Sequence, residues 1–205
     1  MNSMIMKKTI ALLSLTFLVV SAVVLSSAYK VGDTITDFKL KNIDDKLVSL
    51  SDYKEAKGYI IVFTCNHCPY AKAYEDRIID LQNKYGKTYP VIAINPNDAV
   101  KYPDDSFENM KKRAKEKKFP FVYLHDESQS VAQLFGATKT PDVYIVQKEG
   151  VKNVIKYIGA IDNNYQDAKA ATEFYVADAI AALEGGKDIS IKETKAIGCS
   201  IKWKE

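Results

Sequence analysis

The most informative stretch of the sequence is Tyr59–Tyr70, YIIVFTCNHCPY. Its first half is a continuous run of β-branched and aromatic side chains, which is typical of a central strand covered on both faces. From Tyr70 onwards, apolar residues recur at helical spacing at Tyr74, Ile78, Leu81 and Tyr85. The motif Cys65-Asn66-His67-Cys68 therefore stands where a buried strand gives way to a helix.

This position predicts redox chemistry for the two cysteines. Thiols three residues apart at a helix start are close enough to form a disulfide without unfolding the chain. Cys65 is expected on the first helical turn, where free amides and the helix dipole favour a thiolate, so it is the predicted nucleophile. Cys68, one turn further in, is expected to attack a mixed disulfide formed on Cys65. His67 is expected to stabilise the Cys65 thiolate and so make the disulfide a stronger oxidant.

Two further elements concern the same site. Thr140-Pro141 precedes a predicted strand, and a proline held cis there would present backbone groups beside the dithiol. Both residues are therefore predicted to bind the substrate backbone. Cys199 lies in the phrase Gly198–Trp203, after what is predicted to be the last helix. It is either a small buried apolar side chain or a third redox thiol that reaches Cys65 or Cys68.

The remaining elements alternate between strands and helices. This order predicts a central mixed sheet with helices on both faces. A turn cluster between two alternating segments predicts an N-terminal β-hairpin, and a second hairpin closes the sheet. Asp105 and Glu108 are predicted to form a capping box at one helix start. The predicted ranges are Thr36–Leu40, Lys46–Leu50, Val91–Asn95, a helix from Asp105, Phe121–Leu124, Ser130–Phe135, Val143–Val146, Val154–Ile158 and Ala168–Leu183.

Taken together, these features resemble the thioredoxin-like fold of the redoxin superfamily, which includes AhpC/TSA and TlpA-like proteins. The helix and strand of Asp105–Leu124 correspond to that branch's insertion, and Cys65–Tyr70 and Gly198–Trp203 resemble a peroxiredoxin-like subgroup with a CNHC motif. The resemblance implies that Cys65 and Cys68 are the catalytic pair and Pro141 the cis-proline. It implies a thiol–disulfide oxidoreductase acting on protein or small-molecule disulfides and thiols, with no cofactor, no metal and a membrane-bound redox partner.

Two alternatives to this function stay open. The first is a thiol-dependent peroxidase. Peroxiredoxins place a proline and a threonine before the reactive cysteine, and those positions hold Gly58 and Val62 here, which argues against this alternative. The strand before Cys65 also lacks the buried acid that thioredoxins use as a proton relay. A non-catalytic metal-binding module is the second alternative. Its soft ligands would come from Cys65, His67, Cys68, His125 and Cys199, but the sequence has no second paired motif.

Residues 1–28 have the pattern of a secretory signal peptide, with Lys7-Lys8, the apolar stretch Ile10–Leu25 and then Ser26-Ser27-Ala28. We expect export to the bacterial periplasm and one redoxin domain at 29–205, with no stable membrane insertion after cleavage. The alternative is an uncleaved anchor that leaves the domain facing the periplasm. Without its two leader lysines the chain has 27 basic and 26 acidic residues, so its charge argues against a nucleic-acid partner.

Overall fold

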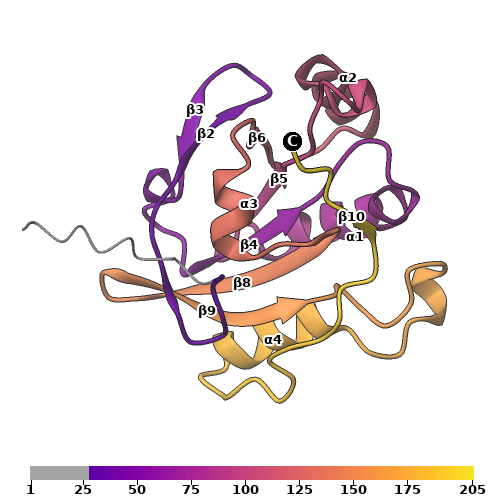
Figure 1. Cartoon of the computed structure of the whole chain (residues 1–205). Helices are drawn as coiled ribbons and strands as arrows, with labels where there is room; N and C mark the ends of the chain where they lie inside the picture. Colours follow the sequence, from indigo (N-terminus) through magenta and orange to yellow (C-terminus); the bar gives the residue numbers. More distant parts are fainter. Residues whose placement is uncertain (1–27) are drawn as a thin grey trace, which may run out of the picture.

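The computed structural model describes residues 28–205, so the predicted leader lies outside the described residues except for Ala28. An eight-stranded mixed sheet forms the centre, in the order β1-β9-β8-β4-β5-β6-β2-β3 (Figure 1). Its strands are β1 Thr34–Ile35, β2 Lys39–Asn42, β3 Leu47–Ser49, β4 Gly58–Phe63, β5 Val91–Asn95, β6 Val122–His125, β8 Asp142–Glu149 and β9 Lys152–Gly159. The helices are α1 Pro69–Tyr85, α2 Phe107–Lys117, α3 Ser130–Phe135 and α4 Tyr175–Glu184, with shorter 3-10 helices η1 Leu50–Asp52, η2 Pro103–Asp105 and η3 Ala168–Ala170.

Strand β4 is the middle of the core, as its apolar run predicts. It pairs parallel with β5 and antiparallel with β8. Ile60 and Val62 face the core shared with α1, α2 and α4, whereas Ile61 and Phe63 face α3 and the N-terminal segment. Because each such buried side chain contributes about 1.5–3 kcal/mol, β4 is held firmly on both faces. The chain therefore leaves the sheet at a fixed point, directly before Cys65.

Most predicted elements are confirmed. The N-terminal hairpin pairs Leu40 with Val48, and β2 continues the sheet by pairing with β6. The closing hairpin is β8–β9, and α3 ends at Gly136, whose positive φ of 69° is a conformation that glycine adopts at no steric cost. The predicted insertion is α2 followed by β6.

The predicted capping box at α2 is wrong. The helix starts after Ser106, and no side chain caps its amides. Asp105 instead ends η2, and its carboxylate turns toward the loop between β4 and α1. The Asp105 side chain does not cap α2, because it accepts hydrogen bonds from residues far away in the sequence.

The last helix is shorter than predicted. Only a 3-10 turn forms at Ala168–Ala170, and α4 begins at Tyr175. In between, the Asn163 side-chain oxygen accepts hydrogen bonds from the backbone N–H groups of Thr172 and Glu173, at 3.0 and 3.3 Å. These bonds hold the segment outside the helix, because an asparagine side chain competes with the helical pattern for backbone amides.

The C-terminal tail crosses the molecule after α4 and passes the start of α1 (Figure 1). Its strand β10, Cys199–Ser200, pairs antiparallel with β7, Lys139–Thr140, with Cys199 opposite Thr140.

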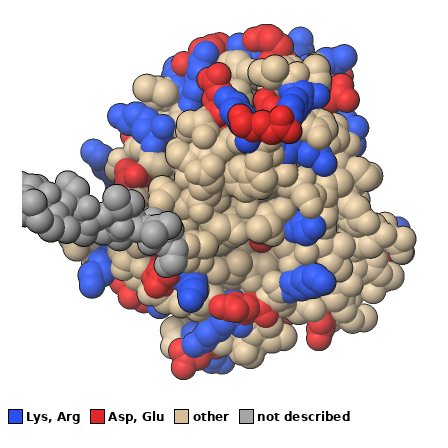
Figure 2. All heavy atoms as spheres, in the orientation of Figure 1, with Lys and Arg blue, Asp and Glu red and all other residues tan. Residues whose placement is uncertain are grey.

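Figure 2 shows the same face of the molecule, and lysine, arginine, aspartate and glutamate gather toward its edges rather than its middle. Within residues 28–205, no helix has both the length and the apolar character needed to span a membrane.

Candidate active site

The two cysteines of the motif lie before α1 and not within it. Cys68 is the N-cap residue and has extended backbone angles, φ −62° and ψ 125°, and Pro69 is the first helical residue. The expectation that Cys65 occupies the first turn and Cys68 the second is therefore wrong. The reason is Pro69, because a residue that precedes proline is sterically disfavoured in the helical region. The positive end of the helix accordingly lies at Cys68.

Thr140 contacts both sulfurs from the other side. Its hydroxyl oxygen lies 3.3 Å from Sγ of Cys65, and its carbonyl oxygen accepts a hydrogen bond from the Cys68 thiol at 3.3 Å. The Thr140–Pro141 peptide bond is cis, as the resemblance implied. Cys65 and Cys68 are only 2% and 0% exposed. The predicted site residues thus meet in one compact cluster, which is closed to solvent at both thiols.

The two thiols also interact with each other. The neighbouring Cys65 lowers the pKa of Cys68, and the neighbouring Cys68 raises the pKa of Cys65. The Cys199 thiol and the backbone N–H of Ala71 lower the pKa of Cys68 further. Burial and the nearby Asp105 carboxylate add to the raised pKa of Cys65. Burial opposes this effect at Cys68, and the Thr140 carbonyl accepts from the protonated Cys68 thiol. The role of Cys65 as the nucleophile stays a prediction.

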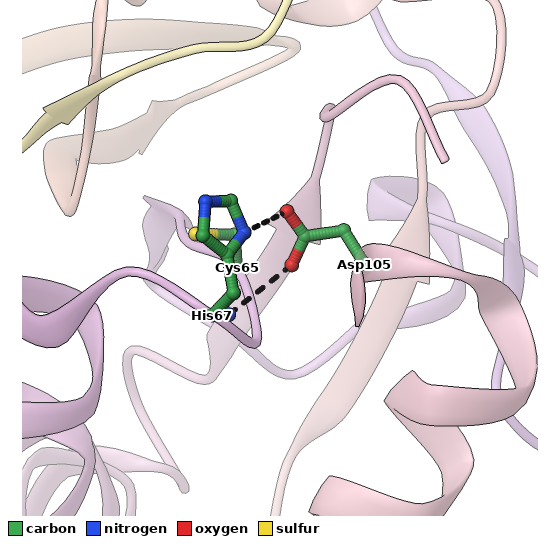
Figure 3. A group of neighbouring side chains, drawn as sticks. All are labelled: Cys65, His67 and Asp105. Atoms are coloured by element: carbon green, nitrogen blue, oxygen red, sulfur yellow. Dashed lines mark hydrogen bonds and ion pairs between the residues drawn. The ribbon is translucent and has the colours of Figure 1, made fainter. Parts of the chain in front are cut away.

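Asp105 is the hydrogen-bond centre of the site, although its local sequence pattern predicts only a helix cap. Its fully buried carboxylate accepts from the backbone N–H of Asn66 at 2.8 Å and from that of His67 at 3.3 Å. Its other oxygen is 2.5 Å from Nδ1 of His67 and accepts from the Asn97 amide at 2.7 Å. Figure 3 shows the His67 ring beside Cys65 with one nitrogen turned to Asp105. A single carboxylate therefore fixes the motif's loop and orients its imidazole.

Two asparagines hold this arrangement in place. Asn66 accepts from the buried Tyr123 hydroxyl at 2.9 Å and donates to the carbonyl of Asp104 at 3.0 Å. Asn97 accepts from the backbone N–H of Lys202, which lies in the C-terminal tail, at 2.9 Å. No local signal marks these residues, because an asparagine or aspartate in a loop is read most simply as a turn residue.

The same group offers donors that a metal could use. One ligand atom each from Cys65, His67 and Asp105 lies within 4.8 Å of the others. However, both carboxylate oxygens of Asp105 already accept hydrogen bonds from four donors. His125 is on β6 with its ring stacked on Phe107, apart from this group. The donor set fits a hydrogen-bonded Cys–His–Asp arrangement better than a metal centre.

Cys199 is the remaining thiol. Together with Tyr70 it packs against the cluster of Cys65, Cys68 and Ala71, and unlike the other two cysteines it is partly exposed. Burial, followed by the neighbouring Cys68, raises the pKa of Cys199. The structure thus brings Cys199 beside the pair, as a third redox thiol requires, and its redox role stays a prediction.

Comparison with known proteins gives the wider context. The model of the AhpC/TSA family matches residues 31–157. Peroxiredoxin Q of Triticum aestivum is 29% identical over 146 residues, which are 67% of this chain and 61% of that protein. Thiol-disulfide oxidoreductase ResA of Oceanobacillus iheyensis is 30% identical over 126 residues, which are 60% of this chain and 62% of that protein. The chain therefore spans about three fifths of the length of these curated relatives.

Solved structures cover more of the chain. An uncharacterized conserved protein from Geobacillus kaustophilus is 39% identical with a TM-score of 0.79, over 87% of this chain and 95% of that one. Peroxidoxin BcpB from Mycobacterium tuberculosis is 16% identical with a TM-score of 0.57, over 76% and 97% respectively. With the central mixed sheet and flanking helices, this likeness confirms the predicted thioredoxin-like fold.

Proposed function

The chain belongs to the AhpC/TSA family, and we propose that it is a thiol–disulfide oxidoreductase whose Cys65–Cys68 pair cycles between dithiol and disulfide. The observation that carries this proposal is that both sulfurs lie in one buried cluster, where the Thr140 hydroxyl and carbonyl oxygens each lie 3.3 Å from one of them. Two cysteines packed in one cluster are arranged to close a disulfide with little movement. The substrates are protein or small-molecule disulfides and thiols, as the oxidoreductase relative's name suggests.

The reaction balances over two electrons. The pair reduces a substrate disulfide to two thiols, and the Cys65–Cys68 bond forms as the substrate's S–S bond breaks. The pair gives up two protons in this direction, and the leaving thiolates take up two. His67 is placed to carry a proton at Cys65, because Asp105 holds its Nδ1 and the ring lies beside the sulfur. This dyad supplies the relay for which β4 has no buried acid.

The test is a disulfide-reduction assay on insulin with a dithiol as electron source. We expect Cys65→Ser and Cys68→Ser each to abolish turnover while both variants keep the native circular dichroism spectrum. Unchanged turnover in either variant would reject the proposal, because a buried thiol that only packs in the core is not consumed in the reaction.

A peroxidase is the second candidate, and the peroxiredoxin relative favours it. Against it stand Gly58 and Val62, which occupy the positions of the peroxiredoxin proline and threonine. We therefore expect hydrogen peroxide to be consumed more slowly than disulfides at equal concentration. Faster consumption of peroxide would make the peroxidase the main activity.

We also propose that the protein is exported and exchanges electrons with a membrane-bound partner. The support is the leader pattern of residues 1–28, together with the resemblance to TlpA-like proteins. The expected mature N-terminus is Tyr29. N-terminal sequencing of protein recovered from the periplasmic fraction tests this, and recovery of the uncleaved chain in the membrane fraction would favour the anchored alternative.

A further inference from the structure

The proposed dithiol is closed off from solvent, which raises the question of how a substrate reaches it. Cys65 is 2% and Cys68 0% exposed. Cys199 packs against the cluster that holds both cysteines and is partly exposed. Building on the proposed function, we propose that Cys199 is the sulfur that exchanges disulfides with external substrates, and that it passes them to the buried pair through Cys68.

The first support is the placement of β10. Cys199 pairs with Thr140, the residue whose hydroxyl and carbonyl contact Cys65 and Cys68. Gly198 packs so closely on the same backbone that a Cβ there would lie 2.3 Å from the Thr140 carbonyl oxygen. The tail thus occupies the edge of β7, where an extended substrate backbone was expected to bind. A built-in strand that brings a cysteine to this edge takes the place of an external peptide.

The second support is that the tail is anchored on the far side of Cys199. The backbone N–H of Ile201 donates to the Thr138 carbonyl at 3.1 Å, and Ile201 itself is 4% exposed. The backbone N–H of Lys202 donates to Asn97, and the Gln129 amide donates to the Lys202 carbonyl at 2.8 Å. These bonds hold Cys199 beside the Cys65–Cys68 pair, so its sulfur is positioned by the fold and not by a freely moving chain end.

The third support is a link from this anchor to the other end of the site. Asn97 accepts from Lys202 and donates to Asp105, and Asp105 in turn holds His67 beside Cys65. One hydrogen-bond chain therefore positions the tail that carries Cys199 and the imidazole that serves Cys65. A tail that only covered the core would not need a hydrogen bond to Asn97, the residue that also binds Asp105.

The exchange proceeds in balanced steps. The Cys199 thiol attacks a substrate disulfide and its proton passes to the leaving sulfur, so that a mixed disulfide forms and one substrate thiol is released. Cys68 then attacks Sγ of Cys199 and its proton passes to the second substrate sulfur, which forms Cys68–Cys199 and releases the second substrate thiol. Finally Cys65, after losing its proton to His67, attacks Cys68, which forms Cys65–Cys68 and frees the Cys199 sulfur. His67 releases its proton to solvent, and Cys199 takes one up to become a thiol again. The pair loses two electrons and the substrate gains them, and the reverse order oxidises a substrate dithiol.

Single-cysteine variants separate these steps by mass mapping. In Cys65→Ser, mild oxidation with oxidised glutathione is expected to give an intramolecular Cys68–Cys199 disulfide. In Cys68→Ser, reaction with the insulin disulfide is expected to trap the substrate on Cys199. A mixed disulfide that maps to Cys65 in this variant would overturn the proposal, because the substrate would then reach the pair directly.

Turnover gives the second readout. Cys199→Ser is expected to lower insulin reduction by about tenfold or more, whereas Ser200→Ala, on the exposed neighbouring residue of the same strand, leaves it within about twofold. Cys199→Ala serves as a second variant if the serine form does not fold. Full turnover of folded Cys199 variants, with Cys65→Ser inactive, would reject the role of Cys199 and leave the proposed function standing. Full activity in every one of the cysteine variants would reject the proposed function itself.

Discussion

Replacing Asp105 by asparagine tests the centre of the site with the smallest change of shape. The carboxylate accepts four hydrogen bonds, two on each oxygen, and is fully buried. An asparagine oxygen can keep the two backbone donors of Asn66 and His67. Its amide group then faces the Asn97 amide and Nδ1 of His67, so one donor loses its acceptor and the imidazole must change tautomer.

The expected cost follows from those bonds. A hydrogen bond to a charged group contributes about 1.5–3 kcal/mol, and an unpaired buried donor costs about 1–3 kcal/mol, partly offset because the charge is no longer buried. We expect Asp105→Asn to lose about 2–4 kcal/mol in free energy of unfolding, measured with urea and far-ultraviolet circular dichroism. Asp104→Asn is the matched control, since its side chain is exposed in the same turn, and should lie within about 0.5 kcal/mol of the native protein.

Turnover distinguishes a role through His67 from a purely structural one. We expect Asp105→Asn to lower disulfide reduction by about tenfold or more, since the imidazole is no longer held in the tautomer that serves Cys65. In a His67→Ala background the same substitution should have little further effect on turnover. An unfolding midpoint equal to that of the native protein, or losses that multiply in the double variant, would refute the reasoning.

Three further predictions concern other parts of the molecule. Burial raises the pKa of Asp142 to about 7, so the native state holds a proton that the unfolded chain releases near pH 4. The free energy of unfolding should therefore fall by about 2–3 kcal/mol between pH 5 and pH 8. Asp142→Asn should remove this pH dependence, measured by urea titration at each pH. Gly198→Ala should lower the melting temperature and slow formation of the Cys68–Cys199 disulfide, because the new Cβ would lie 2.3 Å from the Thr140 carbonyl oxygen. Gly185→Ala is the control, since the nearest atom to its new Cβ is 3.3 Å away. Equal behaviour of the two variants would contradict the tight packing at Gly198. Reduced protein incubated with zinc and desalted should retain far less than one ion per chain, because the Asp105 oxygens are already hydrogen-bonded; stoichiometric zinc would favour the metal-binding alternative.

The site differs from the expected arrangement in where its acid comes from. The strand before the motif contains no carboxylate, and the sequence left the proton relay to water, His67 or a residue elsewhere. The structure supplies Asp105 from η2, which follows the loop after β5. Because β5 lies parallel to β4, the loops at the carboxyl ends of both strands meet at one edge of the sheet, and this brings the carboxylate to the motif.

The elements whose causes are local could be predicted without coordinates. The apolar run of β4, the period of α1 and Pro69 at its first position each act over a few neighbouring residues, so they could be recognised without coordinates. They placed Cys65 and Cys68 between a buried strand and a helix. The extended backbone of Cys68 also has a local cause, since it follows from the proline after it.

The surroundings of the two thiols depend on contacts between segments that are far apart in the sequence. Asp105 meets His67 across 38 residues of sequence, and Cys199 reaches Cys68 through the pairing of β10 with β7. The same aspartate suits a helix cap, and a single cysteine suits a core, so local pattern gives each residue two equally good roles. The choice between them depends on which loops meet at the end of the sheet, and that is fixed by strand order and by the path of the tail rather than by any short stretch of sequence.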